Sequence, residues 1–174
     1  TYTMKERNII VYFKLRSILV AFIFLNFLFS CRSTIYLVRH AEKLPGSTNP
    51  SLTEAGLQRA RVLADSMRNK HIAKIFTTDS NRTRETARFT ALQFNLPFTF
   101  YRKDSLGQLV ESLKKNLGSN MLVVAHSEII QEILSKFGLT LNRPISGYSR
   151  MIIISRRKIL FMQTSKVELT YGVP

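Results

Sequence analysis

Short apolar runs alternate with amphipathic segments along most of this chain, and no other feature constrains its fold as strongly. The apolar runs have the length of buried strands and lie at 35–38, 73–77, 98–101 and 121–125. The segments that follow them carry apolar residues at helical spacing and cover 51–70, 80–94, 105–117 and 129–137. Strands that alternate with helices in this way form a mainly parallel sheet with helices on its faces.

The tail "RMIIISRRKILFMQT" is different, because only Ser155, Arg156, Arg157 and Lys158 separate its two apolar runs. We interpret these three cations as the solvated turn of a hairpin at the sheet edge. No repeat, low-complexity tract or linker interrupts residues 32–174. The sequence therefore predicts a single α/β domain over these residues. It has three layers, with a mainly parallel central sheet flanked by helices and a C-terminal edge hairpin.

Residues 1–31 have the pattern of a bacterial signal peptide. Lys14 and Arg16 precede an apolar stretch from Ile18 to Phe29, which is short for a membrane span of about 20 residues but suits a secretory signal. The stretch ends in "LFSC", which resembles the lipobox in which the cysteine is lipidated. We expect a lipid on Cys31 that anchors the protein to a membrane of the cell envelope, facing the periplasm or the exterior. An uncleaved anchor and a buried helix are the alternatives.

The charge balance favours an anionic partner. Lys and Arg outnumber Asp and Glu by 26 to 11, which gives a formal net charge of +15. Such a balance suits proteins that handle phosphate, bind nucleic acid or lie beside anionic membranes. The chain has no long basic tract, RNA-stacking signature or zinc-finger spacing. We therefore expect no nucleic-acid partner. A basic domain that is anchored to a membrane would be attracted to anionic lipid headgroups, which accounts for the excess of Lys and Arg.

Reactive side chains follow three of the predicted strands. Arg39 and His40 follow the first, a helix with Arg82 and Arg84 follows the second, and His126 follows the fourth. Ligands of open α/β sheets bind beyond the carboxyl ends of the strands, which meet at one edge. We therefore expect two histidines and at least two arginines to converge there, with the third histidine, His71, at the opposite edge.

This set of side chains suits phosphoryl transfer. A guanidinium presents paired donors that match phosphate oxygens, and an imidazole can attack phosphorus to form phosphohistidine. Catalysis then depends mainly on positioning and charge stabilisation. The sequence has no H-E-x-x-H, C-x-x-C or Asp-rich ligand cluster, so we expect neither a metal nor another cofactor.

Four ordered segments resemble the histidine phosphatase superfamily, in its phosphoglycerate mutase-like branch. They are "LVRHAEK", "SLTEAGLQRA", "IFTTDSNRTRETA" and "NMLVVAHSEII", and the resemblance spans Ile35 to about Phe137. Ala41 stands where the family signature usually has glycine. The resemblance implies that His40 is the phosphorylated nucleophile. The rest of the phosphate pocket would be Arg39, Arg82 and His126, with Arg82 preferred to Arg84 because Thr86-Ala87 sets the register.

The resemblance also implies a carboxylic acid that protonates the leaving group. Asp104 in "KDSLG" is the nearest match, although it lies one residue closer to Gly107 than the family pattern has it. Asp104 or Ser105 could instead cap the following helix. Glu42 and Glu128 are the alternative acids.

We therefore expect a metal-independent phosphatase that hydrolyses a phosphomonoester or a phosphoprotein through phosphohistidine at His40. A phosphoglycerate mutase-type phosphotransferase is one alternative. The segment 96–118 is too short for the lid insertions that would exclude water from such a site, which favours hydrolysis. A non-catalytic module that binds a phosphorylated ligand is the other alternative. The sequence leaves the substrate and the oligomeric state open.

Overall fold

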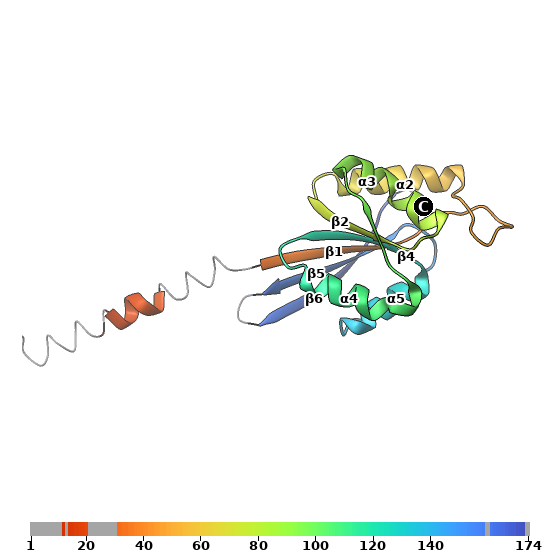
Figure 1. Cartoon of the computed structure of the whole chain (residues 1–174). Coiled ribbons are helices and arrows are strands. Elements are labelled where there is room, and N and C mark those ends of the chain that lie inside the picture. Colours follow the sequence, from red (N-terminus) through yellow and green to blue (C-terminus); the bar gives the residue numbers. More distant parts are fainter. Residues whose placement is uncertain (1–11, 13, 21–30, 159–160, 173–174) are drawn as a thin grey trace, which may run out of the picture.

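The structure is a computed structural model that describes residues 12, 14–20, 31–158 and 161–172 (Figure 1). One six-stranded sheet has the order β3-β2-β4-β1-β5-β6. Its strands are β1 (Cys31–Arg39), β2 (Ile72–Thr77), β3 (Phe98–Phe100), β4 (Asn120–Ala125), β5 (Arg150–Lys158) and β6 (Met162–Thr170). The helices are α2 (Glu54–Met67), α3 (Asn81–Phe94), α4 (Leu106–Lys115) and α5 (Ser127–Lys136), with a 3-10 turn η1 (Lys103–Ser105) before α4.

The first four strands are parallel, and the last two are antiparallel. β4 pairs in parallel with both β1 and β2, and β2 pairs in parallel with β3. β5 runs antiparallel to β1 and to β6, which places the C-terminal hairpin at one edge of the sheet. The mainly parallel α/β fold with an edge hairpin is therefore confirmed.

Alternate residues of β1 supply two cores on opposite faces of the sheet. Ile35 and Leu37 belong to the core that contains residues of α4 and α5. Tyr36 and Val38 belong to the core that contains residues of α2 and α3. Figure 1 shows these helix pairs on opposite sides of the sheet, which gives the three layers. Apolar residues on both faces explain why this strand is a continuous apolar run in the sequence.

The start of α2 packs tightly against the loop that follows β1. Thr53 is the N-cap, and its hydroxyl accepts a hydrogen bond of 3.1 Å from the amide of Gly56. This selects Thr53 over Ser51 as the cap. A Cβ atom at Gly56 would overlap the carbonyl oxygen of Glu42. Glycine is therefore required at this position for the close approach of helix and loop.

The predicted basic turn of the hairpin is wrong. Arg156, Arg157 and Lys158 are the last residues of β5, and Arg156 is buried. Its Nη1 donates to the carbonyl oxygens of Leu113 and Lys114 at 3.0 and 2.9 Å. Burial of this guanidinium is tolerated because it satisfies carbonyls at the end of α4 that have no partner within the helix.

The predicted signal segment lies mostly outside the described residues. Residues 14–20 are helical, and Leu15, Ile18, Leu19 and Val20 are exposed. Within the described ranges, no helix has both the length and the apolar content needed to cross a membrane. β1 starts at Cys31, four residues earlier than its apolar run, because residues 31–34 pair with the end of β5.

Candidate active site

His40 lies directly after β1, at the carboxyl end of the parallel strands. Its backbone amide donates to the carbonyl oxygen of Ala125 at 3.0 Å, which continues the pairing of β1 with β4. The side chain is only 4% exposed and lines a pocket of about 260 Å³. The imidazole is therefore a buried side chain that lines this pocket, and it is not a solvated residue at the end of a strand.

The surroundings of His40 fix its tautomer and its charge. Nδ1 lies 2.8 Å from the carbonyl oxygen of Ala41. A carbonyl only accepts, so Nδ1 carries the proton and Nε2 keeps its lone pair. Burial lowers the pKa of His40 to about 4, and the positive charges of Arg39 and Arg82 act in the same direction. The ring is thus neutral at neutral pH, with Nε2 available as a nucleophile.

Arg82 and His126 reach the same pocket from two other elements. Arg82 is in the first turn of α3, and His126 is the N-cap of α5, directly after β4. Arg82 Nη2 lies 3.5 Å from His126 Nε2, and the rings of His126 and His40 are 5.3 Å apart at 70°. Burial lowers the pKa of His126 to about 4, and the positive charges of Lys103 and Arg82 act in the same direction.

A threonine links the nucleophile segment to the helix that carries Arg82. Thr86 Oγ1 accepts from the amide of Ala41 at 2.9 Å and donates to the carbonyl of Arg82 at 2.6 Å. The residue after His40 and the backbone of Arg82 are therefore held by one buried hydroxyl. This gives a physical reason for a threonine four residues after the arginine in the segment "RTRET".

Arg39 is held beside His40 by a loop that no sequence pattern singled out. Its Nη1 donates to the carbonyl oxygen of Gly147 at 3.3 Å. Its guanidinium carbon lies 4.6 Å from the ring centroid of Tyr148, within the range of a cation–π contact. The Tyr148 ring is also 5.9 Å from the His40 ring. The Nε of Arg39 is buried and has no hydrogen-bond partner among the described residues.

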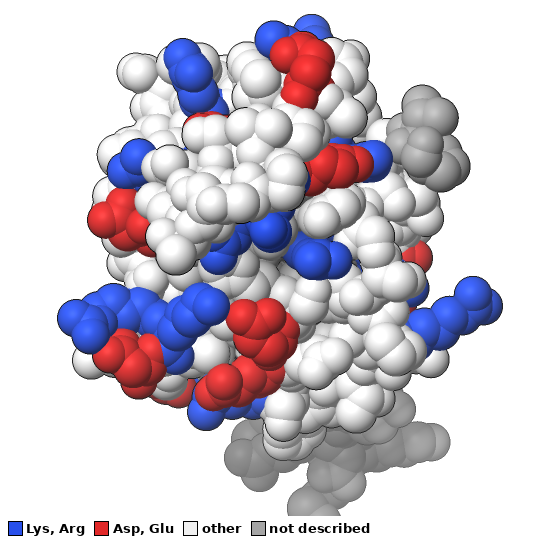
Figure 2. Space-filling view, turned by 90° about the vertical axis from the view of Figure 1, so that its right-hand side faces the viewer, with Lys and Arg blue, Asp and Glu red and all other residues white. Residues whose placement is uncertain are grey.

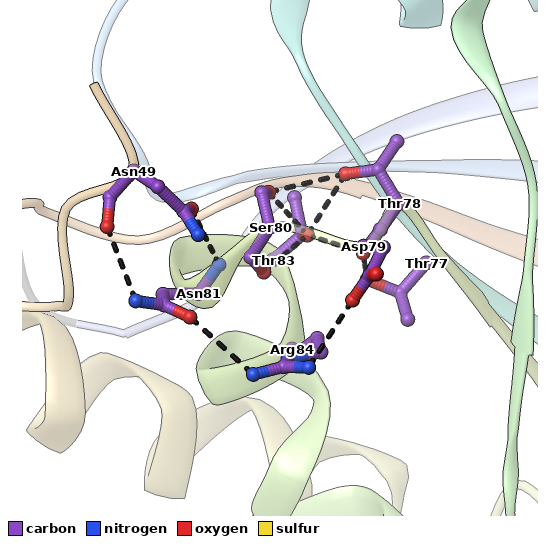
Figure 3. A network of polar contacts seen from close by, with 8 residues as sticks. All are labelled: Asn49, Thr77, Thr78, Asp79, Ser80, Asn81, Thr83 and Arg84. Atoms are coloured by element: carbon purple, nitrogen blue, oxygen red, sulfur yellow. Dashed lines mark hydrogen bonds and ion pairs between the residues drawn. The ribbon is translucent and has the colours of Figure 1, made fainter.

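A polar network fixes the first turn of α3 (Figure 3). The hydroxyls of Thr78, Ser80 and Thr83 lie within 2.8–3.2 Å of one another. The amide of Asn81 donates to Asn49 Oδ1, and the Asn81 side chain donates to the carbonyl of Asn49. Because Arg82 follows Asn81, this network positions Arg82 relative to the loop between β1 and α2.

Arg84 takes part in this network and not in the pocket. Its guanidinium donates to Asp79 Oδ1 at 3.1 Å and to Asn81 Oδ1 at 3.3 Å (Figure 3). His71 lies before β2, at the end of that strand opposite to the pocket. The structure thus brings together Arg39, His40, Arg82 and His126, and leaves Arg84 and His71 outside the set.

The three candidate acids occupy different places. Glu42 points to α2, where both of its oxygens accept from Arg59 and the shortest ion-pair distance is 2.6 Å. Asp104 is exposed and pairs with Arg102 at 2.6 Å, on a hollow that adjoins the pocket of His40. Glu128 is the candidate that lines the His40 pocket itself, where it pairs with Lys103 at 3.2 Å.

The pKa values of these carboxyls are all lowered. The hydrogen bond from Arg102 lowers the pKa of Asp104. For Glu128, burial raises the pKa, but its own backbone amide and Lys103 outweigh burial and lower it. For Glu42 the hydrogen bonds from Arg59 likewise outweigh burial. All three carboxyls are consequently ionised at neutral pH in this arrangement.

The pocket is strongly cationic. Its lining includes four basic side chains, from Arg39, Lys43, Arg82 and Lys103. Figure 2 shows this end of the molecule, with basic side chains in a central hollow and both basic and acidic side chains around it. An adjoining hollow of about 390 Å³ shares Arg82, Lys103 and His126 with the pocket. The surface therefore suits an anionic group held at His40 and a larger substituent beside it.

Sequence reasoning missed several residues of this pocket. They are Lys43, Ser47, Thr48 and Lys103 on its lining, and Tyr148 beside it. Lys43 and Lys103 lie within the segments "LVRHAEK" and "KDSLG", so their proximity to candidate residues was a usable signal. Ser47, Thr48 and Tyr148 come from loops whose path depends on the folded structure. Within the residues that the structure describes, no three His, Cys, Asp or Glu side chains are grouped as metal ligands would be.

The fold and this pocket define an α/β protein with a buried histidine in a cationic pocket at the carboxyl edge of its sheet. Residues 35–103 match the family model of the histidine phosphatase superfamily (branch 1). Over these residues the chain is similar to the histidine phosphatase superfamily. The expected resemblance is thus confirmed over residues 35–103, and members of this superfamily are phosphatases or mutases.

Individual relatives support this assignment to different extents. "Probable phosphoglycerate mutase GpmB" from Yersinia pestis (strain Pestoides F) is 36% identical over 64 residues, which cover 33% of this chain and 30% of that protein. The match thus spans less than a third of this curated relative. YhfR from Bacillus stearothermophilus has 19% identity and a TM-score of 0.59, over 70% of this chain and 90% of that one. The protein histidine phosphatase SixA complexed with tungstate has 15% identity and a TM-score of 0.57, over 75% and 96%. The two structures show a shared fold.

Proposed function

We propose that this protein is a metal-independent phosphatase that hydrolyses a phosphorylated substrate through a phosphohistidine at His40 Nε2. The observation that carries the proposal is the state of His40. Its Nδ1 proton is held by the Ala41 carbonyl, and the ring is neutral, so Nε2 has a free lone pair inside a cationic pocket. This is the state that nucleophilic attack on phosphorus requires.

In the first step Nε2 of His40 forms a bond to phosphorus as the bond from phosphorus to the leaving group breaks. The guanidiniums of Arg39 and Arg82 and the ring of His126 surround the phosphoryl oxygens and stabilise their charge. The buried Nε of Arg39 lacks a hydrogen-bond partner among the described residues. Because this guanidinium lines the pocket, its Nε–H is a donor that is left for a phosphoryl oxygen. The leaving group extends into the adjoining hollow lined by Thr78, Ser80 and Tyr101.

In the second step water attacks phosphorus, the bond to Nε2 breaks, and inorganic phosphate leaves. Glu128 lines the pocket as an ionised carboxylate, so it is placed to take a proton from the water. Only residues 101–105 connect β3 to α4, which leaves no inserted lid at this side of the pocket. Access of water favours hydrolysis over transfer of the phosphoryl group back to a bound substrate.

The leaving group receives little help from a protein acid. The expected donor, Asp104, is exposed and paired with Arg102, and Glu128 is paired with Lys103. We therefore propose substrates whose leaving group departs without strong proton donation, such as aryl phosphates or phosphohistidine on a protein. The ionised state of these carboxyls also favours the alternative function, a module that binds a phosphorylated ligand without turnover.

A trapping experiment separates the two functions. The wild-type chain is mixed with an aryl phosphate whose phosphoryl group carries a label, and the reaction is quenched in base, which preserves phosphohistidine. Both the released phosphate and the labelled protein are measured. We expect turnover and a labelled protein in the wild type and in His71→Asn, and neither in His40→Ala. Turnover that survives His40→Ala contradicts the proposed mechanism. Phosphate binding by calorimetry, without turnover or label, would instead establish the binding module.

A further inference from the structure

The end of the domain opposite to the pocket exposes a compact set of basic and apolar side chains. Cys31, Lys158 and Met162 lie next to one another across β1, β5 and β6, because Cys31 pairs with Lys158 and Lys158 pairs with Met162. Phe161 is 82% exposed and Met162 is 43% exposed. Arg32 and Lys158 are exposed beside them. We call Arg32, Lys158, Phe161 and Met162 the tip surface.

The tip surface has no negative charge in its own segments. Residues 31–35 and 155–164 contain Arg32, Arg156, Arg157 and Lys158 and no Asp or Glu. The buried Arg156 also binds the carbonyls of Leu113 and Lys114, which brings the basic end of α4 to the same end of the sheet. By contrast, Glu42, Asp79, Asp104 and Glu128 lie around the carboxyl ends of the strands.

We propose that the tip surface docks on an anionic lipid bilayer, with Phe161 and Met162 at the level of the headgroups and acyl chains. The partner follows from the combination of features. Exposed aromatic and thioether side chains beside cations fit an interface that is anionic outside and apolar within. The sequence before Cys31 is apolar from Ile18 to Phe29 except for Asn26, and Cys31 itself lies at this end of the sheet.

This docking orients the catalytic pocket. β1 extends from Cys31 at the tip surface to Arg39 at the pocket, a strand of nine residues. At about 3.3 Å per residue, the pocket lies on the order of 25 Å from the lipid surface. Figure 1 shows the strands carrying the chain from one end of the domain to the other. Headgroups of the same bilayer are therefore out of reach, and the substrate is a water-soluble molecule or a protein.

The chain contains no tryptophan, so a single introduced tryptophan reports on its own surroundings. We would reconstitute full-length Phe161→Trp into phosphatidylcholine vesicles with and without 30% phosphatidylglycerol, and measure the emission maximum and the quenching by lipids brominated in their acyl chains. The matched control is Leu92→Trp, because Leu92 is 67% exposed on α3. The N-terminal segment is the same in both variants, so its membrane binding does not distinguish them.

We expect a blue shift and quenching for Phe161→Trp in the anionic vesicles, and neither for Leu92→Trp. Adding Arg32→Gln and Lys158→Gln should lower the equilibrium constant for docking by roughly fivefold per charge removed. Equal responses of the two tryptophans, or none for Phe161→Trp, overturn the proposal. A blue shift caused by duplex DNA or by raised protein concentration, but not by anionic vesicles, overturns it in favour of a nucleic-acid or self-association surface.

Discussion

The imidazole rings of His40 and His126 lie 5.3 Å apart at an interplanar angle of 70°, although they follow different strands. The two strands are hydrogen-bonded neighbours in the sheet, with Arg39 opposite Ala125. Each histidine is the next residue after this pair, so the parallel register itself sets the two rings side by side. Burial lowers the pKa of both rings to about 4, so two neutral imidazoles share one cationic pocket.

The first prediction concerns pH. Both histidines should stay neutral down to about pH 4, and activity should be lost as the pH falls through that value, because protonated His40 has no lone pair at Nε2. NMR titration of the ring carbon-bound protons measures the pKa values directly. A midpoint near the ordinary value of 6.5 for either ring would refute this electrostatic account of the pocket.

The same shifts predict how stability depends on pH. Between pH 6.5 and 4 the unfolded chain binds protons at these histidines that the folded chain does not, so the free energy of unfolding falls as the pH decreases. Each unit of pKa shift corresponds to about 1.4 kcal/mol per histidine. Urea unfolding of the wild type and of the double variant His40→Ala/His126→Ala checks this. The double variant should show a flatter dependence over that interval.

The second prediction compares two carboxylates. Glu128→Gln should slow breakdown of the phosphohistidine by roughly 10- to 100-fold, because it removes the carboxylate that lines the pocket. Asp104→Asn should change turnover less than threefold, because its carboxylate is exposed and paired with Arg102 outside that pocket. Single-turnover measurement of labelled protein separates formation from breakdown. A larger loss in Asp104→Asn would show that Asp104 is the proton donor after all.

The third prediction concerns two buried threonines of α3. Thr86→Val removes a hydroxyl that accepts from Ala41 and donates to Arg82, so it should cost about 1–3 kcal/mol and also reduce activity. Thr90→Val is the matched control. Thr90 Oγ1 is buried without a hydrogen-bond partner among the described residues, so its removal should be neutral or stabilising. Thermal unfolding of both variants tests this contrast, and equal destabilisation would contradict it.

The fourth prediction concerns two glycines in helices. Gly56→Ala should destabilise the protein by at least about 2 kcal/mol, because the new Cβ would overlap the backbone carbonyl of Glu42. Gly107→Ala in α4 should instead be neutral or stabilise by up to about 1 kcal/mol, because no atom lies within 4 Å of its Cβ position and alanine favours the helix. Denaturant midpoints measure both. Similar midpoints for the two variants would disprove the steric argument.

Much of the fold was predictable from local pattern. The apolar runs at 35–38 and 121–125 became the neighbouring strands β1 and β4, since a strand buried on both faces must be apolar throughout. Parallel strands bring their carboxyl ends to one edge, so the sequence by itself determined that His40, His126 and at least two arginines meet there, while the family resemblance selected Arg82 over Arg84. The convergence itself needs only the order of strands and helices along the chain.

Tertiary structure decided what the sequence left open. Among three candidate acids, only contacts could show that Glu42 turns to Arg59, Asp104 to Arg102 and Glu128 to Lys103. Likewise, Arg156 became a buried donor because the end of α4 lies against β5, and Tyr148 reached Arg39 along an irregular loop. Such partners depend on the distances between segments in the folded structure. The pattern of residues along the sequence does not give these distances. The order of strands and helices determined that the two histidines and the arginines meet at the pocket, and the packing decided their partners and their protonation state.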